Sequence, residues 1–570
     1  MSDIALTTSV PPSPAAAHAP ARSFLAHAKL ISVLTLASRF FGLAREIVAA
    51  HYLGTGLVAS AFTVAFTIPN LFRKLFGEGA LSAAFIPLYS RAIKHDDVTG
   101  ANAFAAASVN LLCSILLSIT IVGEIGLWIC IAVASRPDLV LTLKLTAIML
   151  PYVLLICGGA FLSGILQVHH RFAAPAAAPI ILNICHILVL GIGGWILHLG
   201  HAMPEAQAIG PQTKLAYAAA FVVLVAGVMQ VLILLPGLRA TGFRFRIVPH
   251  FWTPQVKQML KLTVPVALGA GVLQLSVLMD KGIAIGLMQH VDAAGHPINH
   301  FSFLGHRIAL PMESGAPRRL DIAQFLYQFP LGVFAIALAT AIFPGLSASA
   351  LEKDREHFKS VLRQGLEATI FEGLPASLGL MLVAGPAIRL LFQHGQITAH
   401  DADLIQRSVI FYSGAIWAFS MLQIINRAYY AIHDTTTPVV MSIVNIVLNI
   451  VVEIPLLWVM GEPAMAVGTL VSFAIQTLVM LYMLNRRVGG LELGRLRIPT
   501  LKMLLATLIM GIALFAIMRS PAYPTGASRW IWSSQLAILM LVGASVYLLS
   551  CYLLRLDLLA QFLPKRRSAA

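Results

Sequence analysis

The sequence predicts an all-α polytopic membrane protein with about fourteen transmembrane helices. Hydrophobic residues make up 58% of the chain and charged residues only 11%, whereas a soluble domain carries about 25% charged residues. The mean hydropathy is +0.84, and apolar runs of about 20 residues, long enough to cross a bilayer, recur along the chain. No polar region is long enough to form a second domain, so a soluble multidomain enzyme is excluded.

Neither the N-terminal tail nor the cysteines indicate a functional site. Residues 1–28 are rich in Ala, Pro and Ser, and we expect a disordered tail. No apolar core precedes the first span, so a cleaved signal peptide is not expected. The five cysteines fall in or beside apolar runs without metal-ligand spacing, which predicts buried thiols.

The predicted spans, in order, follow the apolar runs. Their approximate limits are 30–53, 57–90 (broken near Gly77–Gly79), 103–134, 139–168, 174–199, 214–238, 257–289, 321–350, 361–392, 402–432, 436–459, 463–485, 499–518 and 530–555.

The charge of the connections predicts the orientation. The chain has 39 Lys and Arg against 24 Asp and Glu, and in membrane proteins such an excess marks cytoplasmic loops. Basic residues concentrate in 239–261, 486–502 and 565–567. An even number of spans puts both termini on one side, so we expect both termini in the cytoplasm.

An internal repeat predicts two halves of six helices. LQVHHRF (166–172) and LQIINRA (422–428) align at the ends of the fourth and tenth spans, and each is followed by a span containing Pro and Asn. Parallel repeats of this kind are related by an axis along the membrane normal, although a short motif can also match by chance. The resulting division is a tail (1–28), an N-terminal lobe (29–240), a C-terminal lobe (241–490) with an external loop (290–320), two added helices (491–560) and a basic cytoplasmic tail (561–570).

The first two spans carry too much charge to be passive anchors. Arg39, Arg45 and Glu46 lie in SRFFGLARE (38–46), and a basic residue at the centre of a lipid-facing helix costs about 2.5–3.5 kcal/mol on insertion scales. Helical geometry places both arginines where they can flank one cavity. Arg73 and Lys74 of the second span suit either that cavity or a membrane interface, to which long basic side chains can extend. A hydrated, cationic central cavity is therefore expected.

Further polar residues leave alternatives open. Asp280 and Lys281 in the seventh span are either a self-neutralising pair or part of a cation site, for which Asp280, Asn426 and Asp434 are the candidates. Histidines in the 290–320 loop have spacings that fit no compact zinc site, so we expect a solvated loop and no metal. The chain lacks a Walker-type phosphate loop, GxSxG elbow or HExxH helix. We expect no cofactor, no catalytic residue and no nucleic acid partner, with transport driven by the membrane potential or an ion gradient.

The chain resembles the lipid II flippase (MurJ/MviN) family of the multidrug/oligosaccharidyl-lipid/polysaccharide exporter superfamily, over about residues 28–560. The resemblance is carried by SRFFGLARE (38–46), PNLFRKLFGEGALSAAFIP (69–87), FPLGVFAIALATAIFP (329–344), LFQHGQIT (391–398) and NRAYYAIHDTTTP (426–438). It implies two six-helix lobes around a central cavity, with two C-terminal helices forming a groove for a polyprenyl tail. It also implies alternating access for a polyprenyl-diphosphate-linked disaccharide-pentapeptide in the bacterial inner membrane.

The resemblance assigns cavity residues, and the chain departs from it at three positions. Family residues for substrate binding fall on Arg39, Arg45, Asn70, Arg73, Lys74 and Glu78, with Glu46 beside them. The family's Asp and Lys of the second span are Ser60 and Thr67 here, and its eighth-span arginine is Phe325. Arg318 or Arg319 could supply the missing charge if the eighth helix extends to Pro317; otherwise both are solvated loop residues.

Three hypotheses follow. The first is a lipid II flippase. The second is a flippase for another polyprenyl-linked oligosaccharide, and the third is a membrane protein that binds such lipids without moving them. Membrane lipids are expected partners, and cell-wall synthesis or division proteins are candidate partners.

Overall fold

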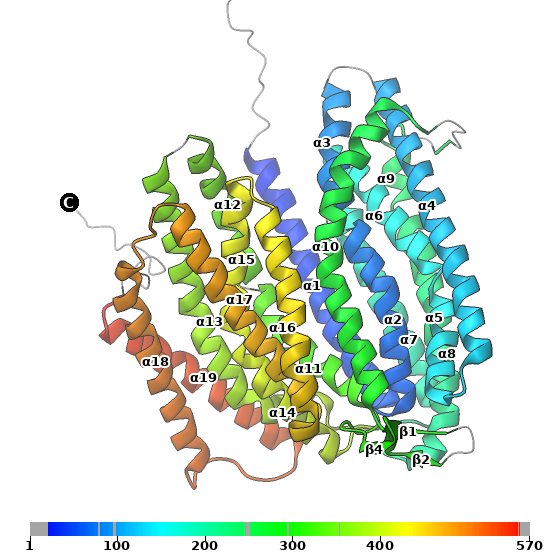
Figure 1. Ribbon diagram of the computed structural model, residues 1–570, viewed down its shortest axis with the longest axis vertical. Helices are drawn as coiled ribbons and strands as arrows, with labels where there is room; N and C mark the ends of the chain where they lie inside the picture. The colour runs from blue at the N-terminus through cyan, green and yellow to red at the C-terminus, as the bar shows by residue number, and fades with distance from the viewer. Residues whose placement is uncertain are drawn as a thin grey trace, which may run out of the picture.

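The computed structural model describes residues 21–77, 80–94, 98–243, 245–246, 251–292, 296–333, 335–352, 354–556 and 558. These residues form long helices in two groups that stand side by side (Figure 1). The prediction of a helical polytopic membrane protein is confirmed.

The first group contains the helices of the predicted N-terminal lobe. They are α1 (Ala21–Leu53), α2 (Leu57–Phe72), the π-helical turn η1 (Arg73–Gly77), α3 (Ala80–Lys94), α4 (Val98–Val133), α5 (Pro137–Met149), α6 (Tyr152–Val168), α7 (Ala173–Ile196), α8 (Glu205–Leu232) and α9 (Leu235–Arg239). The predicted break in the second span is present as η1, four residues after Pro69. Proline removes a helical hydrogen bond and commonly disrupts the helix around it.

The second group begins after α10 (Pro254–Leu287), which contacts α3 and α4 of the first group as well as α11 and α16 of the second. Its helices are α11 (Ala316–Val333), α12 (Ala335–Leu351), α13 (Arg355–Phe392), α14 (Ala399–Gly414), α15 (Ile416–Ala431), α16 (Thr436–Met460), α17 (Pro463–Arg487), α18 (Gly494–Arg519) and α19 (Arg529–Leu553).

Each predicted span coincides with one helix or with a broken pair. By length and hydropathy, eight described helices can cross a membrane, or up to eleven if each bent pair is one span. The segments α1, α2–α3 and α10 are not among them. The total of fourteen spans stays a prediction.

The broken spans recur at the positions that the internal repeat predicts. The fourth span bends by 40° between α5 and α6, and the tenth bends by 41° between α14 and α15. The second span is broken at η1, and the eighth bends by 46° between α11 and α12. Two breaks at equivalent places in each half support the repeat.

Each of the two groups of helices has its own buried hydrophobic clusters. In the first group, three clusters centre on Phe85, Leu145 and Leu190. In the second, one cluster joins α12, α13, α15 and α17 to α18 and α19. The other surrounds Leu320 and takes in Ala50 of α1, so the first group contacts the second at this level.

Two β-hairpins in the 290–320 connection were not predicted. Strands β1 (His290–Val291) and β2 (Pro297–Ile298) pair antiparallel, as do β3 (His300–Phe303) and β4 (His306–Ala309). The Trp458 indole of α16 donates to the Ala309 carbonyl at 3.0 Å, which fixes β4 against the second group.

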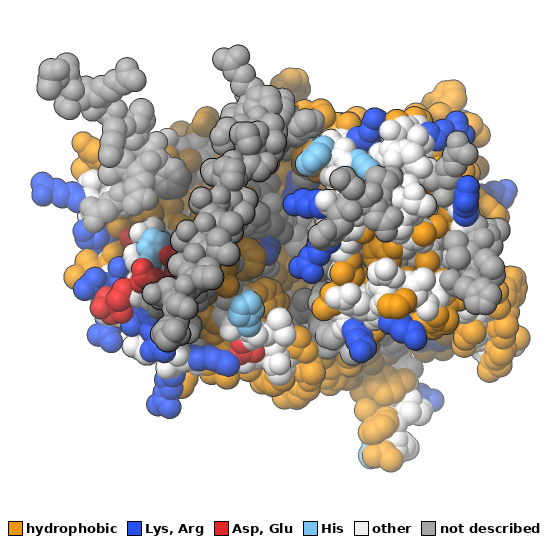
Figure 2. All heavy atoms as spheres, turned by 90° about the horizontal axis from the view of Figure 1, so that it is seen from above, with side chains coloured by type: hydrophobic (Ala, Val, Ile, Leu, Met, Phe, Trp, Pro, Cys, Tyr) orange, Lys and Arg blue, Asp and Glu red, His pale blue; other side chains and the backbone are white. Residues whose placement is uncertain are grey.

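The hairpins lie at the opposite end of the molecule from the start of α1 and the α17–α18 connection (Figure 1). The start of α1 and the α17–α18 connection lie toward the upper end in Figure 1, and the hairpins lie at the lower end. Helices α3, α9 and α17 finish with basic residues in their last turns. Lys and Arg side chains gather on both halves of the upper face (Figure 2). This separation agrees with the predicted orientation of 290–320 relative to 486–502.

Candidate functional site

Two connected cavities lie where the two groups of helices meet. The larger has a volume of about 510 Å³ and the smaller about 230 Å³. Both are lined by Phe325 and by three glutamines of α10 and α11: Gln274, Gln324 and Gln328. Lys74 of η1 also borders both. The polar lining identifies one composite site between the halves.

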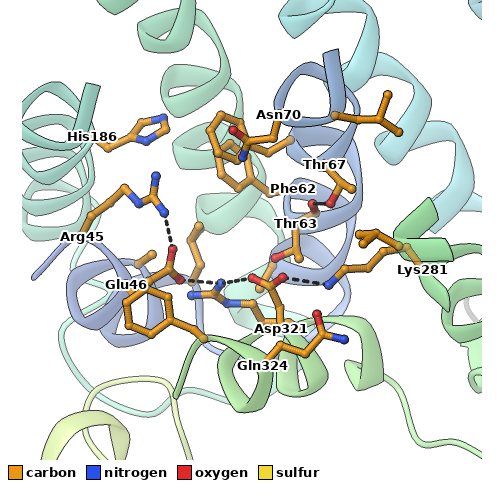
Figure 3. Close-up of a pocket in the computed structure, with 18 of the residues that line it drawn as sticks. Arg45, Glu46, Phe62, Thr63, Thr67, Asn70, His186, Lys281, Asp321 and Gln324 are labelled. Atoms are coloured by element: carbon orange, nitrogen blue, oxygen red, sulfur yellow. Dashed lines mark hydrogen bonds and ion pairs between the residues drawn. The ribbon is translucent and has the colours of Figure 1, made fainter. Parts of the chain in front are cut away.

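A chain of alternating charges crosses the smaller cavity (Figure 3). Arg45 donates to Glu46 at 2.6 Å, and the other carboxylate oxygen of Glu46 accepts from Arg318 at 2.9 Å. Arg318 also contacts Asp321 at 3.3 Å, which accepts from Lys281 at 2.8 Å. The chain therefore links α1 to α11 and then to α10, and it joins the two groups of helices by ion pairs.

The described lining of the larger cavity includes Arg39 and several amide side chains. Arg39 of α1 lines it and donates to the Gly332 carbonyl of α11 at 3.0 Å. Further polar side chains of the second group join the glutamines named above, among them Gln423, Ser442, Asn445, Asn449 and Thr469. Amides offer both donors and acceptors, so this wall can hydrogen-bond to neutral sugars and peptide groups.

The remaining predicted residues of the second span border a third cavity, of about 420 Å³, within the first group. Asn70 and Arg73 line it together with Arg45, and the Arg73 Nε donates to the Asn70 side-chain oxygen at 3.3 Å. The structure thus places Arg73 at a cavity rather than only at a helix end. Glu78 lies outside the described residues.

The two candidates for the missing arginine have different surroundings. Helix α11 begins at Ala316, so the predicted extension to Pro317 is confirmed, and Arg318 lines the smaller cavity together with Phe325. Arg319 is not among the described residues that line the two connected cavities. Its side chain is 3% exposed and binds Glu462 and Asp401 of the second group. Neighbouring helix positions point about 100° apart, which separates the two arginines.

Contacts between the groups close the site at the hairpin end. The Thr55 hydroxyl, at the start of α2, donates to Asp401 of α14 at 2.6 Å. The Nδ1 atoms of His51 and His394 lie 2.8 Å apart. The backbone N–H of Gln396 donates to the His51 carbonyl at 2.9 Å. A Cβ at Gly395, where φ is +63°, would overlap His51, so this close approach requires glycine.

Burial lowers the pKa of His394, which lies in the connection between α13 and α14, and the facing His51 ring lowers it further. The positive charge of Arg529 also acts on both rings, so each ring favours its neutral form. Protonation of His394 therefore opposes the contact across the two groups.

The predicted cation set is not brought together. Asp280 lines the larger cavity and accepts from Asn449 at 3.2 Å. Asp434 lies in the α15–α16 connection, where it accepts from Thr436, Thr437 and Arg487. Fifteen residues separate Asp434 from Asn449, about 20 Å along a helix. Asn426 is likewise absent from the described lining of the cavity that holds Asp280. In the described structure, Asn426 and Asp434 therefore do not lie with Asp280.

Several site residues were missed from the sequence. Asn449 also donates to Glu453 at 3.1 Å, and Glu453 is fully buried. His186 of α7 is 2% exposed and lines the smaller cavity beside Arg45 (Figure 3). The available signal was a polar residue in an apolar span, the same signal that identified Arg39.

The comparisons with known proteins agree on one family. A family model described as lipid II flippase MurJ matches residues 49–532. A probable lipid II flippase MurJ of Rhizobium tropici is 30% identical over 532 residues, covering 91% of this chain and 92% of that protein. The lipid II flippase MurJ of Burkholderia cenocepacia is 28% identical over 471 residues, covering 80% and 83%.

Solved structures share the fold. A lipid II flippase MurJ in an inward closed conformation has a TM-score of 0.71 at 23% identity, covering 93% of this chain and 99% of that one. An inward-facing multidrug resistance MATE family transporter of the MOP superfamily has a TM-score of 0.62 at 14% identity, covering 82% and 99%.

Proposed function

The chain belongs to the lipid II flippase MurJ family, and from this premise we propose that it moves the lipid-linked peptidoglycan precursor across the bacterial inner membrane. The substrate is undecaprenyl diphosphate carrying a disaccharide-pentapeptide, and transfer runs from the inner to the outer leaflet. The observation that supports this is the cationic, amide-lined cavity between two groups of helices. The chain is a transporter and not an enzyme.

The lining matches the parts of that substrate by chemistry. Arg39 and Arg45 offer planar guanidinium groups, which bind phosphate oxygens in pairs. The amides of the larger cavity suit the sugar and peptide groups. Helices α18 and α19 expose many apolar side chains, among them Leu501, Ile512 and Leu541, and this surface is suited to the polyprenyl tail.

In alternating access, the contacts at the hairpin end must break when the other end of the cavity closes. The contact of Thr55 with Asp401 and the pair His51–His394 cross between the groups at this end. The orientation that we propose, with both termini in the cytoplasm, makes the described conformation closed toward the outside. Proteins of cell-wall synthesis or division are then candidate partners at either face.

We further propose that an ion gradient supplies the driving force through Asp280, Asn449 and Glu453. The two carboxylates approach the same Asn449 amide, at 3.2 and 3.1 Å. Among the described residues, one oxygen of Glu453 and the side-chain oxygen of Asn449 have no hydrogen-bond partner. Hard oxygen ligands of this kind suit a small cation. Asp280→Asn should remove the dependence of transport on the driving cation, and unchanged dependence would contradict the assignment.

Depletion in cells, combined with transport in vesicles, tests the main proposal. Depletion should cause swelling and lysis with accumulation of lipid-linked precursor, and the wild-type chain should reverse both effects. In vesicles, the chain should make a labelled lipid II accessible from the opposite side. Transfer of another polyprenyl-linked oligosaccharide alone would favour the second hypothesis, and binding without transfer would favour the third.

A further inference from the structure

Among the described residues, two buried nitrogen atoms of side chains that line the smaller cavity lack hydrogen-bond partners. The side chains of His186 and Arg318 belong to residues that are 2% and 5% exposed, and both residues line this cavity. Within the described part of the chain, neither His186 Nε2 nor Arg318 Nη2 has a hydrogen-bond partner. Buried polar atoms are nearly always satisfied, so two such atoms at one cavity indicate a group that binds there.

The ligand chemistry is indicated by the carboxylate already present. Glu46 lies between two guanidinium groups, with one oxygen 2.6 Å from Arg45 and the other 2.9 Å from Arg318. These arginines thus already hold two oxygens of one anion. Phosphate oxygens have the same preference for paired guanidinium donors, so a phosphate group can replace the carboxylate at these donors.

The charge of the smaller cavity fits a diphosphate. Among the described residues that line it, four are basic and two are acidic: Arg45, Lys74, Lys281 and Arg318 against Glu46 and Asp321. The formal difference is two positive charges. A diphosphate esterified at both ends carries about two negative charges at neutral pH, so its charge is opposite in sign to the formal excess on these side chains.

We propose that His186 and Arg318 are substrate-contact residues, which complete with Arg45 a diphosphate subsite at the closed end of the smaller cavity. Arg318 Nη2 donates to one phosphate group. The other ring nitrogen of His186 is hydrogen-bonded to the Ala219 backbone, so His186 donates through Nε2 as the imidazolium, the form that a neighbouring phosphate anion favours. Glu46 occupies the subsite when substrate is absent. The proposal deepens the proposed function and rests on it.

Substrate binding at this subsite would also loosen the closed end. The Glu46–Arg318 pair joins α1 of the first group to α11 of the second. A diphosphate that takes over Arg318 removes this link, whereas Glu46 keeps its neighbour Arg45. Occupation of the site by the correct anion is thereby coupled to separation of the two groups.

The test is binding of undecaprenyl diphosphate to the full chain in lipid nanodiscs, with undecaprenyl monophosphate as the comparison ligand. His186→Leu and Arg318→Gln should each weaken diphosphate binding by about tenfold or more, because each loses a hydrogen bond to a charged group. His186→Gln, which keeps a donor, should retain most of the affinity. Glu46→Gln should tighten binding by about tenfold, because it removes the competing charge.

Arg363→Gln is the matched control for an arginine change. Arg363 pairs with Glu492 at 3.2 Å and is not among the described lining residues of the cavities. Misfolding cannot mimic the expected pattern, because Glu46→Gln changes the affinity in the opposite direction. If the wild type binds diphosphate and the His186, Arg318 and Glu46 variants bind it equally well, the subsite is wrong while the proposed function stands. If the wild type binds no polyprenyl diphosphate, both are overturned.

Discussion

A single hydroxyl group at Thr55 should help to set the balance between closed and open states of the hairpin end. Thr55 and Asp401 are both buried, at 4% and 9% exposure, and their 2.6 Å hydrogen bond crosses between the two groups of helices. Thr55→Val has nearly the same shape but cannot donate. The substitution therefore removes the bond while changing the packing little.

The size of the expected shift between closed and open states depends on the interactions that Asp401 retains in Thr55→Val. A hydrogen bond to a charged group contributes about 1.5–3 kcal/mol. Asp401 retains its hydrogen bonds from Thr398 and its ion pair with Arg319. We therefore expect the free-energy loss to lie at the lower limit of this range. About 1.5 kcal/mol corresponds to an approximately tenfold rise in the ratio of open to closed molecules.

The assay is a distance distribution between spin labels at Ala202 and Ala399, which are exposed residues on opposite sides of the contact. Thr437→Val is the control, because the Thr437 hydroxyl donates to Asp434 at the same 2.6 Å without crossing between the groups. Thr55→Ser should resemble the wild type. An identical distribution for wild type and Thr55→Val would refute the assignment of this bond to the closed state.

Three further predictions concern transport, pH and orientation. Arg39→Ala and Arg45→Ala should each abolish transfer while the protein stays in the membrane, and Lys should restore only part, because it lacks the paired geometry of guanidinium; full activity of the alanine variants in vesicles would contradict their role. Because the pKa of His394 is lowered in the closed contact, the contact contributes fully above about pH 6.5 and is lost as the pH falls through the lowered value. Spin-label distances at pH 5 and pH 8 should therefore differ. Because the facing His51 ring can also take up a proton, the difference should vanish only when both rings are replaced, in the double variant His51→Gln/His394→Gln. Single cysteines in 290–320 should react with an impermeant thiol reagent from outside and those in 486–502 should not; the reverse pattern would invert the orientation.

The fold was predictable because the bilayer leaves few choices for an apolar chain. A backbone in hydrocarbon must satisfy its own hydrogen bonds, so the long apolar runs had to become helices. The break at η1 followed from Pro69 and the glycines after it. The β-hairpins between α10 and α11 were missed, because that connection is polar and its short strands are held by contacts such as Trp458 with Ala309.

From the sequence, only those features of the site that depend on a single helix could be predicted. Arg39 and Arg45 were identified because a charge in an apolar span needs water or a partner. The residues that pair with such charges could not be identified from the sequence. Arg318 binds Glu46 across 272 positions of sequence, and Asn449 reaches Asp280 across 169. The predicted cation set shows the same limit, because the sequence does not reveal that Asp434 pairs with Arg487.

Arg318 and Arg319 show where sequence reasoning must stop. Both are basic residues at the start of one helix, and both were equal candidates for the charge that Phe325 lacks. A rotation of about 100° per residue points Arg318 into the cavity and Arg319 toward Glu462 and Asp401. The choice depends on which side of α11 meets α1 and which side meets α14, and this is a property of the assembled halves. The structure brings Arg318, two helical turns before Phe325, to the same cavity, where it pairs with Glu46. That Arg318 replaces the charge missing at Phe325 stays a prediction.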